Sequence, residues 1–377
     1  MTTTTRHAES TELPPMLFMA LELGSKKWKV AFAIGLGHRP RIVQIPAGNL
    51  LRLWAEIGRA KDALGLTRAA GVRSCYEAGR DGFWLHRALT AQGIINVVVD
   101  PSSITVDRRK RRAKTDRIDG TALVVQLQHA LAGDRRGWRE VRVPTVQAES
   151  DRQLQREWET VRQDRTRIRN RLHGLLATLG VAVPLTRQFQ MRLTTARLWD
   201  GSPPPPAYVA RLEREWRQLL EVEARLRLLR RLRTARLHGS DVVAEQTRTL
   251  AGLRGIAANG ALTLATELFA WRAFTNGRQV GAIVGLTPTP YRSDQTAFEQ
   301  GISQSGNRRV RALAVELAWS WLRYQPDSAL TRWFHQRFGE HARARRIGIV
   351  AVARKLLIAL WRYVDQGILP AGAVVKA

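Results

Sequence analysis

The chain has 377 residues, of which 61 are Lys or Arg and 32 are Asp or Glu, so its formal net charge is +29. This length allows two or three domains with a substantial core, and the positive excess predicts a polyanionic partner, nucleic acid before a membrane surface. A single cysteine, Cys75, excludes a disulfide framework and a cysteine-based zinc site, and no apolar run approaches the roughly 18 residues of a membrane span.

The first half of the chain is predicted to alternate strands and helices. Residues 1–15 lack the apolar core of a signal peptide and are expected to be a disordered lead-in. Hydrophobic periodicity then predicts, in order, strands over 16–23, 28–34 and 41–45, a helix over 49–64, a strand over 72–76, a helix over 83–89 and a strand over 94–99. A last helix is expected to carry Asp116 and Asp119 and to end near Ala130.

One glutamate lies in a predicted strand and another directly follows one. Glu22 lies inside the first apolar strand, and Glu77 follows the fourth. A carboxylate in an apolar strand is costly unless it is paired or binds a metal ion. Glu22 is therefore a candidate metal ligand, and the alternative is an ion pair with Lys26 or Lys27.

The stretch 113–119 carries two further carboxylates beside a cationic run. In a helix, Asp116 and Asp119 lie one turn apart on one face, where they repel each other unless a cation such as Mg²⁺ lies between them. The alternative is a solvated face on which they pair with neighbouring cations. The cations just upstream, which suit a polyanion, are Arg108, Arg109, Lys110, Arg111, Arg112 and Lys114.

The predicted order β-β-β-α-β-α-β-α is that of the RNase H and RuvC nuclease fold. In that fold the first and fourth strands are neighbours, so their acids and those of the last helix converge on a metal site. The order therefore places Glu22, Glu77, Asp116 and Asp119 at one candidate site.

The middle of the chain is predicted to form two long charged helices. From about Val146, apolar residues recur at three- and four-residue steps, as in a coiled-coil seam interrupted by Arg165. A Pro-rich break over 181–206 precedes a second helix over about 207–238. The helices could pair within one chain or build a dimer, and their arginines could bind RNA or DNA or form a solvated charged face.

The last region combines helices with a segment rich in Pro and Gly. The stretch 253–257 with a helix over 262–269 resembles half of a helix-hairpin-helix, although an ordinary interhelical turn fits equally well. Residues 287–293 are expected to form an irregular loop, and helices are expected over 312–322 and 347–364. Ser293 is one candidate nucleophile on that loop, and the others are Tyr291, Ser303 and Ser305.

With these stretches together, the chain resembles the DEDD transposases of bacterial insertion sequences of the one-ten family, which are bridge-RNA-guided serine recombinases. The resemblance covers nearly the whole chain. Its most specific pieces are KTDRID at 114–119, GLTP at 285–288 leading to Ser293, and GISQSGNRR at 301–309.

The resemblance implies an α/β plus all-α fold: a RuvC-like domain over 16–138, a helical coiled-coil region over 139–245 and a mainly α-helical transposase domain over 246–377. It implies an acidic tetrad of Glu22, Glu77, Asp116 and Asp119 that holds Mg²⁺, or alternatively Mn²⁺, and a catalytic serine at Ser293. Nucleic-acid contacts are expected from the 108–114 cations and from Arg292, Asn307, Arg308, Arg309 and Arg311.

The implied activity is DNA cleavage and religation through a phosphoserine intermediate. The implied partners are donor and target double-stranded DNA, a structured noncoding guide RNA and further copies of the chain, as a homodimer that assembles into a tetramer on two DNAs. No membrane is expected, and the implied location is the bacterial cytoplasm and nucleoid.

Glu22 departs from the family pattern, which has Asp at that position. The extra methylene moves the carboxylate, and Mg²⁺ demands tight octahedral geometry. Two other readings therefore stay open: a RuvC-like endonuclease or resolvase that uses metal-activated water, and a nucleic-acid-binding scaffold whose metal site has decayed.

Overall fold

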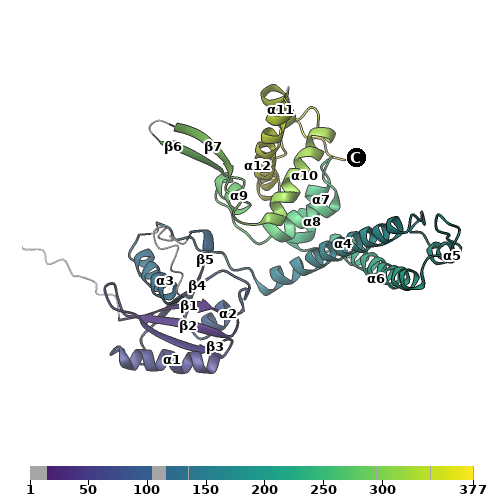
Figure 1. Cartoon of the computed structure of the whole chain (residues 1–377). Coiled ribbons are helices and arrows are strands. Elements are labelled where there is room, and N and C mark those ends of the chain that lie inside the picture. Colours follow the sequence, from purple (N-terminus) through teal and green to yellow (C-terminus); the bar gives the residue numbers. More distant parts are fainter. Residues whose placement is uncertain (1–14, 104–115, 135, 294–295, 340, 377) are drawn as a thin grey trace, which may run out of the picture. The chain divides into compact units, whose positions relative to one another are not determined.

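The computed structural model describes residues 15–103, 116–134, 136–293, 296–339 and 341–376, with the side chains of residues 102, 116–119 and 290–300 outside that description. The predicted lead-in over 1–15 therefore lies almost wholly outside the described residues. The chain divides after Val143 into two compact units (Figure 1).

The first unit is built on a five-stranded mixed sheet in the order β3-β2-β1-β4-β5. Strands β1, β2 and β3 form an antiparallel meander, and β4 and β5 continue the sheet parallel to β1. The strand bounds are Leu17–Leu23, Lys27–Ala33, Arg41–Pro46, Val72–Glu77 and Ile95–Val99. All five predicted strands are present within one or two residues, and β1 and β4 are neighbours, as expected.

Helices cover both faces of this sheet (Figure 1). Helices α1 (Leu50–Ala63) and α2 (Trp84–Ala91) pack on one face through a core of large side chains that includes Trp28, Phe32 and Tyr76. Helix α3 (Asp116–Leu131) packs on the other face. A short 3-10 turn, Pro101–Ser103, follows β5.

The residues beneath α3 are smaller. They include Ala20, Ala31, Ala33 and Cys75, all of which are buried and pack with the apolar residues of α3. Side chains alternate along a strand, so the sequence itself separates a face of large apolar residues from a face of small ones.

The second unit begins with two long helices. They pair within the chain, which is the first of the two arrangements that the sequence left open. Helices α4 (Val146–Thr178) and α6 (Pro206–Leu237) lie side by side, and the short helix α5 (Phe189–Thr194) lies in the connection between them (Figure 1). Their shared core includes Leu172, Leu176 and Leu212, with Phe189 stacked on Trp216 at a centroid distance of 4.6 Å.

The rest of the second unit is a helical bundle with one hairpin. The helices are α7 (Val242–Ala251), α8 (Ala258–Leu264) with the π-helix Ala265–Phe269, α9 (Gly277–Ile283), α10 (Arg308–Tyr324), α11 (Ala329–Phe338) and α12 (Ala342–Gln366). Their common core includes Leu264, Val310, Trp321, Phe334 and Leu357.

The prediction of an irregular loop over 287–293 is wrong. Strand β6 (Pro288–Ser293) pairs antiparallel with β7 (Thr296–Ile302). Two prolines in β6 argue against a central strand, but the hairpin is a two-stranded sheet in which both strands are edges. A register shift between Pro288 and Pro290 accommodates them.

Among the residues that the structure describes, no helix is long and apolar enough to cross a membrane.

Candidate functional site

Two of the predicted acids lie next to each other in the first unit. The parallel register of β1 and β4 ends with Leu21 opposite Tyr76, so Glu22 and Glu77 are the next residues on each strand. Neighbouring strands are about 4.8 Å apart. By alternation from Ala20 and Cys75, both side chains belong to the face that α3 covers. The sheet thus brings together two carboxylates that are 55 positions apart in the sequence.

Glu22 has a cation beside it. Its cross-strand neighbour is Lys29 of β2, and Lys29 Nζ lies 3.9 Å from Glu22 Oε2. The side chains are 19% exposed for Lys29 and 34% for Glu22, so the pair is half-buried. The sequence offered Lys26 or Lys27 as the ion-pair partner, and the structure replaces both with Lys29. The ion-pair partner of Glu22 depends on the strand register, which a single sequence does not give.

Helix α3 crosses the same face. A Cβ placed on Gly120 would lie 3.9 Å from Ala31 Cβ of β2, and Cys75 Sγ of β4 donates to the Leu123 carbonyl at 3.8 Å. The backbone is helical from Asp116 onward, so Asp116 and Asp119 are one turn apart at the start of this helix.

The remaining first-unit candidates lie outside the described residues. These are the side chains of Asp116 and Asp119 and the whole of Arg108, Arg109, Lys110, Arg111, Arg112 and Lys114. Within the described part of the chain, no group of three or more His, Cys, Asp or Glu residues could hold a metal ion. Because two of the four predicted ligands are outside that part, the tetrad stays a prediction.

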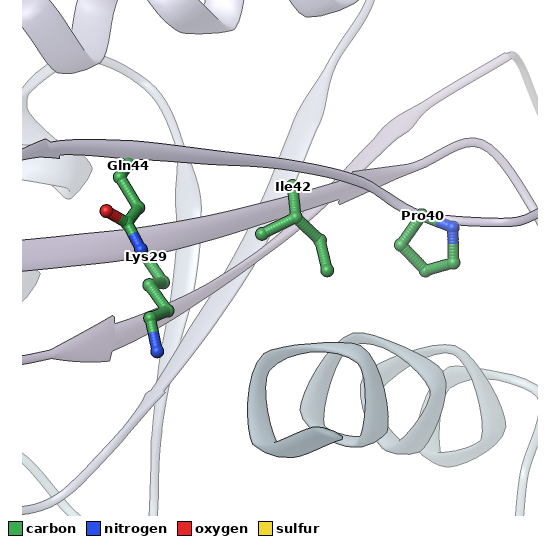
Figure 2. Close-up of a pocket in the computed structure, with 4 residues that line it drawn as sticks. All are labelled: Lys29, Pro40, Ile42 and Gln44. Atoms are coloured by element: carbon green, nitrogen blue, oxygen red, sulfur yellow. The ribbon is translucent and has the colours of Figure 1, made fainter. Parts of the chain in front are cut away.

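An open hollow of about 350 Å³ lies on this face, beside the Glu22–Lys29 pair. Its lining residues are Lys29, Pro40, Ile42 and Gln44 (Figure 2). Lys29 and Gln44 are directly opposite each other on β2 and β3. The hollow therefore offers an ammonium group and an amide beside Glu22.

Ser293 lies in the second unit, at the end of β6. Its register partner is Thr296 across the hairpin turn. The side chains of Tyr291, Arg292 and Ser293 lie outside the described residues. Of the other candidate hydroxyls, Ser305 Oγ donates to Ser303 Oγ at 3.2 Å in the segment that follows β7.

Two glycines close the base of this hairpin. Gly285 has φ +69° and Gly306 has φ +88°. A Cβ on Gly285 would lie 2.1 Å from the Ser305 carbonyl oxygen, and one on Gly306 would lie 2.2 Å from the Ile283 carbonyl oxygen. The two chain segments touch backbone to backbone here, which only glycine permits. This contact gives a physical reason for the glycines of GLTP and GISQSGN.

The cations after the hairpin differ in their surroundings. Arg308 is exposed. The Arg311 guanidinium donates to the carbonyl oxygens of Val284 at 2.9 Å and Ser305 at 3.5 Å. Arg309 binds Glu159 and Glu267, and Asn307 caps α10 by accepting from the backbone N–H groups of Arg309 and Val310. Among the predicted contact residues whose side chains the structure describes, Arg308 is therefore the exposed one.

Sequence reasoning missed Glu267. It is 1% exposed, in the π-helix that follows α8. The signal was available, because Glu267 interrupts the apolar run 261–270 in the same way that Glu22 interrupts the first strand. Hydrophobic periodicity predicts an ordinary helix over 262–269 and does not single out this carboxylate.

The C-terminal part of the chain matches a protein-family model. Residues 247–332 match the model described as "Transposase IS116/IS110/IS902 family". This segment contains Glu267, Ser293 and Asn307.

Three curated relatives extend the similarity over most of the chain. "Putative transposase y4rJ" of Sinorhizobium fredii is 38% identical over 381 residues, which is 96% of this chain and 94% of the relative. "Putative transposase y4qE" of the same organism is 30% identical over 73% of this chain and 66% of the relative. "Transposase for insertion sequence element IS1328" of Yersinia enterocolitica is 26% identical over 54% of this chain and 59% of the relative.

Proposed function

This chain belongs to the IS116/IS110/IS902 family of insertion-sequence transposases, and we propose that it cuts and rejoins DNA through a phosphoserine link at Ser293. Glu22, Glu77, Asp116 and Asp119 are the proposed acidic residues, Mg²⁺ or Mn²⁺ the proposed cofactor, and a structured guide RNA the proposed source of sequence choice. The observation that carries the proposal is the juxtaposition of Glu22 and Glu77 on the sheet face that α3 covers.

The first unit is proposed to be a RuvC-like domain of the RNase H fold. The strand order β3-β2-β1-β4-β5 supports this assignment, as do the three antiparallel strands followed by two parallel ones. In the proposed site the first and fourth strands contribute Glu22 and Glu77, and the last helix contributes Asp116 and Asp119.

The residues present fit a hard divalent cation. Carboxylate oxygens are its preferred ligands, and Glu22 and Glu77 share a face of the sheet. Lys29 counts against tight binding, because its ammonium group already lies 3.9 Å from Glu22. When bound there, the cation supplies positive charge that stabilises the phosphate oxygens during bond breakage.

Ser293 is the proposed nucleophile. Its Oγ forms a bond to phosphorus as the bond from phosphorus to the leaving DNA oxygen breaks. The hydroxyl proton passes to one of the proposed acidic residues, supplied by another copy of the chain, because a serine hydroxyl is a weak nucleophile without an assisting base. The leaving oxygen takes up a proton. Attack by a second DNA hydroxyl on the same phosphorus reverses these steps and frees Ser293.

The charge of the chain supports the proposed nucleic-acid partners. With a net charge of +29, it binds phosphate backbones strongly and in a salt-dependent way. Phosphate contacts carry no base preference, so selection of a DNA site needs another reader. Base pairing with a guide RNA is the proposed reader, and the protein recognises the shape and backbone of that RNA.

A hydrolytic RuvC-like nuclease is the second candidate, favoured by the fact that Glu22 and Glu77 meet without any contribution from Ser293. A non-catalytic nucleic-acid scaffold is the third, favoured by the Glu22–Lys29 pair, since a structural carboxylate binds a cation in this way. If the metal site has decayed, Glu22→Asp restores cleavage to an inactive protein.

The test is a cleavage assay with purified protein, Mg²⁺, its own flanking noncoding RNA and labelled element-end DNA. The variants are Ser293→Ala and Glu77→Gln, with the exposed α4 residue Ser150→Ala as the matched control. A protein-linked DNA band that Ser293→Ala abolishes and Ser150→Ala retains supports the recombinase. Cleavage by Ser293→Ala without that band indicates the hydrolytic nuclease, and binding without cleavage indicates the scaffold.

A further inference from the structure

Glu267 is a buried carboxylate that binds Arg156 of the long helix α4. It is 1% exposed and lies among the buried residues of the π-helix Ala265–Phe269. Burying a carboxylate is costly unless cations and hydrogen-bond donors surround it. π-Helical turns are rare and occur frequently at functional sites.

Three elements meet at this carboxylate. Arg156 of α4 binds it through two hydrogen bonds, Nε to Oε1 at 2.7 Å and Nη2 to Oε2 at 2.9 Å. Asn307 Nδ2 donates to Oε2 at 3.3 Å, and Arg309 Nη1 of α10 donates to Oε1 at 3.4 Å. Arg309 also binds Glu159 of α4. Forked Arg–carboxylate pairs fix both distance and orientation.

The Asn307 side chain links this carboxylate to the hairpin. Its Oδ1 accepts hydrogen bonds from Arg309 N at 3.1 Å and Val310 N at 3.2 Å, which caps α10. Its backbone N donates to the Ile283 carbonyl at 2.9 Å, at the glycine contact that closes the hairpin. Asn307 therefore joins Glu267 to both chain segments from which β6 and β7 extend.

Glu267 stays ionised in these surroundings. Burial raises its pKa, but the hydrogen bonds from Arg156 and the charges of Arg156, Arg152 and Arg309 lower it more, and the pKa lies below the ordinary value. A charged group that accepts hydrogen bonds from α4 and from the start of α10 holds these elements more firmly than a neutral group would.

We propose that Glu267 is a positioning residue that fixes the β6–β7 hairpin to helix α4, so that the coiled coil and the strand carrying Ser293 move as one body. The functional meaning of this coupling rests on the proposed role of Ser293. Nucleic acid held along the arginine-rich long helices thereby sets the position of the nucleophile. The contacts themselves do not depend on what Ser293 does.

The first experiment measures motion of the hairpin without any reaction. Cys75 is the single cysteine and is buried, so Ser293→Cys in the full chain adds a second thiol, at position 293, for a nitroxide spin label. Glu267→Gln keeps the side-chain volume and removes the charge. The control is Glu215→Gln, which breaks a similar forked pair, Arg171 Nε and Nη2 to Glu215, between α4 and α6.

We expect the label at position 293 to reorient about twofold faster or more in Glu267→Gln, on the nanosecond scale, and to be unchanged in Glu215→Gln. Identical spectra in the parent, Glu267→Gln and Glu215→Gln would overturn the proposal. Asn307→Ser provides a second variant, because serine still caps α10 but cannot donate to Glu267 as the Asn307 amide does. Its label must move as in Glu267→Gln, and a parent-like spectrum overturns the coupling even if Glu267→Gln fails to fold.

The second experiment uses the chain with Ser293 intact. At saturating DNA, Glu267→Gln should form the protein–DNA link about tenfold more slowly, with unchanged DNA affinity, because a misplaced nucleophile affects the chemical step. Equal rates for Glu267→Gln and Glu215→Gln would contradict the positioning role. If Ser293→Ala retains full activity, the proposed function fails, whereas the spin-label result still decides the coupling.

Discussion

The two faces of the five-stranded sheet are made from alternating residues of the same strands, yet they differ in character. The face under α1 and α2 is lined by Trp28, Phe32 and Tyr76, all large and fully buried. The face under α3 is lined by alanines and Cys75, and it ends at Glu22 and Glu77. Large side chains fill space and contribute stability, whereas small ones let a helix approach and leave room for charged groups. One face of the sheet therefore maintains the fold, and the other holds the candidate chemistry.

The largest expected effect is on the apolar face. Trp28→Ala should lower the free energy of unfolding by about 3–5 kcal/mol, because it removes a 1% exposed indole from the core. Chemical denaturation monitored by circular dichroism measures this change. Trp84→Ala is the control, since Trp84 packs against Trp28 at 5.8 Å but is 41% exposed. An equal loss of unfolding free energy in both variants would contradict the conclusion that burial of Trp28 causes the effect.

The next largest effect is on the opposite face, and on activity instead of stability. Glu77→Gln should slow DNA cleavage by about 100-fold or more, as expected for loss of a metal ligand. Because Glu77 is exposed, the unfolding transition should move little. Gel-based cleavage rates test the expected loss of activity, and thermal melts on the same preparation test the unchanged stability. Full activity in Glu77→Gln would contradict the assignment of the candidate chemistry to the face under α3.

Lys29 gives a smaller, sharper test, because it follows Trp28 in β2 and points to the other face. Its ammonium group neutralises Glu22 and opposes a second cation. Lys29→Met should therefore lower the Mg²⁺ concentration needed for half-maximal cleavage by roughly fivefold, equivalent to about 1 kcal/mol for a partly exposed pair. A magnesium titration of cleavage measures this value. A higher Mg²⁺ requirement would instead mean that Lys29 assists the reaction.

The smallest expected effect concerns a polar chain on the apolar face. Ser74 Oγ donates to Asn96 Oδ1 at 2.7 Å, and Asn96 Nδ2 lies 2.9 Å from His86 Nδ1. Burial, assisted by the charge of Arg87, lowers the pKa of His86. The unfolded chain therefore takes up this proton first, and stability falls as the pH drops from above about 6.5 through the folded pKa.

His86→Gln keeps a possible acceptor for Asn96 and removes the titration. Between about pH 7.5 and pH 5.5, the melting temperature of the parent should fall slightly more than that of His86→Gln. Differential scanning calorimetry at the two pH values makes the comparison. Parallel pH profiles would show that His86 does not couple folding to protonation.

Hydrophobic periodicity predicted the first unit well because each strand is short and bounded by turns. The position of Glu22 inside an apolar strand correctly marked it as a residue that needs a cation, although the cation is Lys29 and depends on strand register. The second unit was less predictable. Strand β6 was not predicted because it contains Pro288 and Pro290, and helix α11 was not predicted either. The role of Glu267 depends on Arg156, which is 111 positions away in the sequence, so local patterns could not reveal it.

The most direct test of the proposed function is to locate the covalent bond. Protein, Mg²⁺, flanking noncoding RNA and element-end DNA are allowed to react, the products are digested with protease and nuclease, and the nucleotide-bearing peptide is sequenced by mass spectrometry. The proposed function predicts a phosphodiester on Ser293, absent from Ser293→Ala. A link on Tyr291, Ser303 or Ser305, or efficient cleavage without any linked peptide, would contradict it.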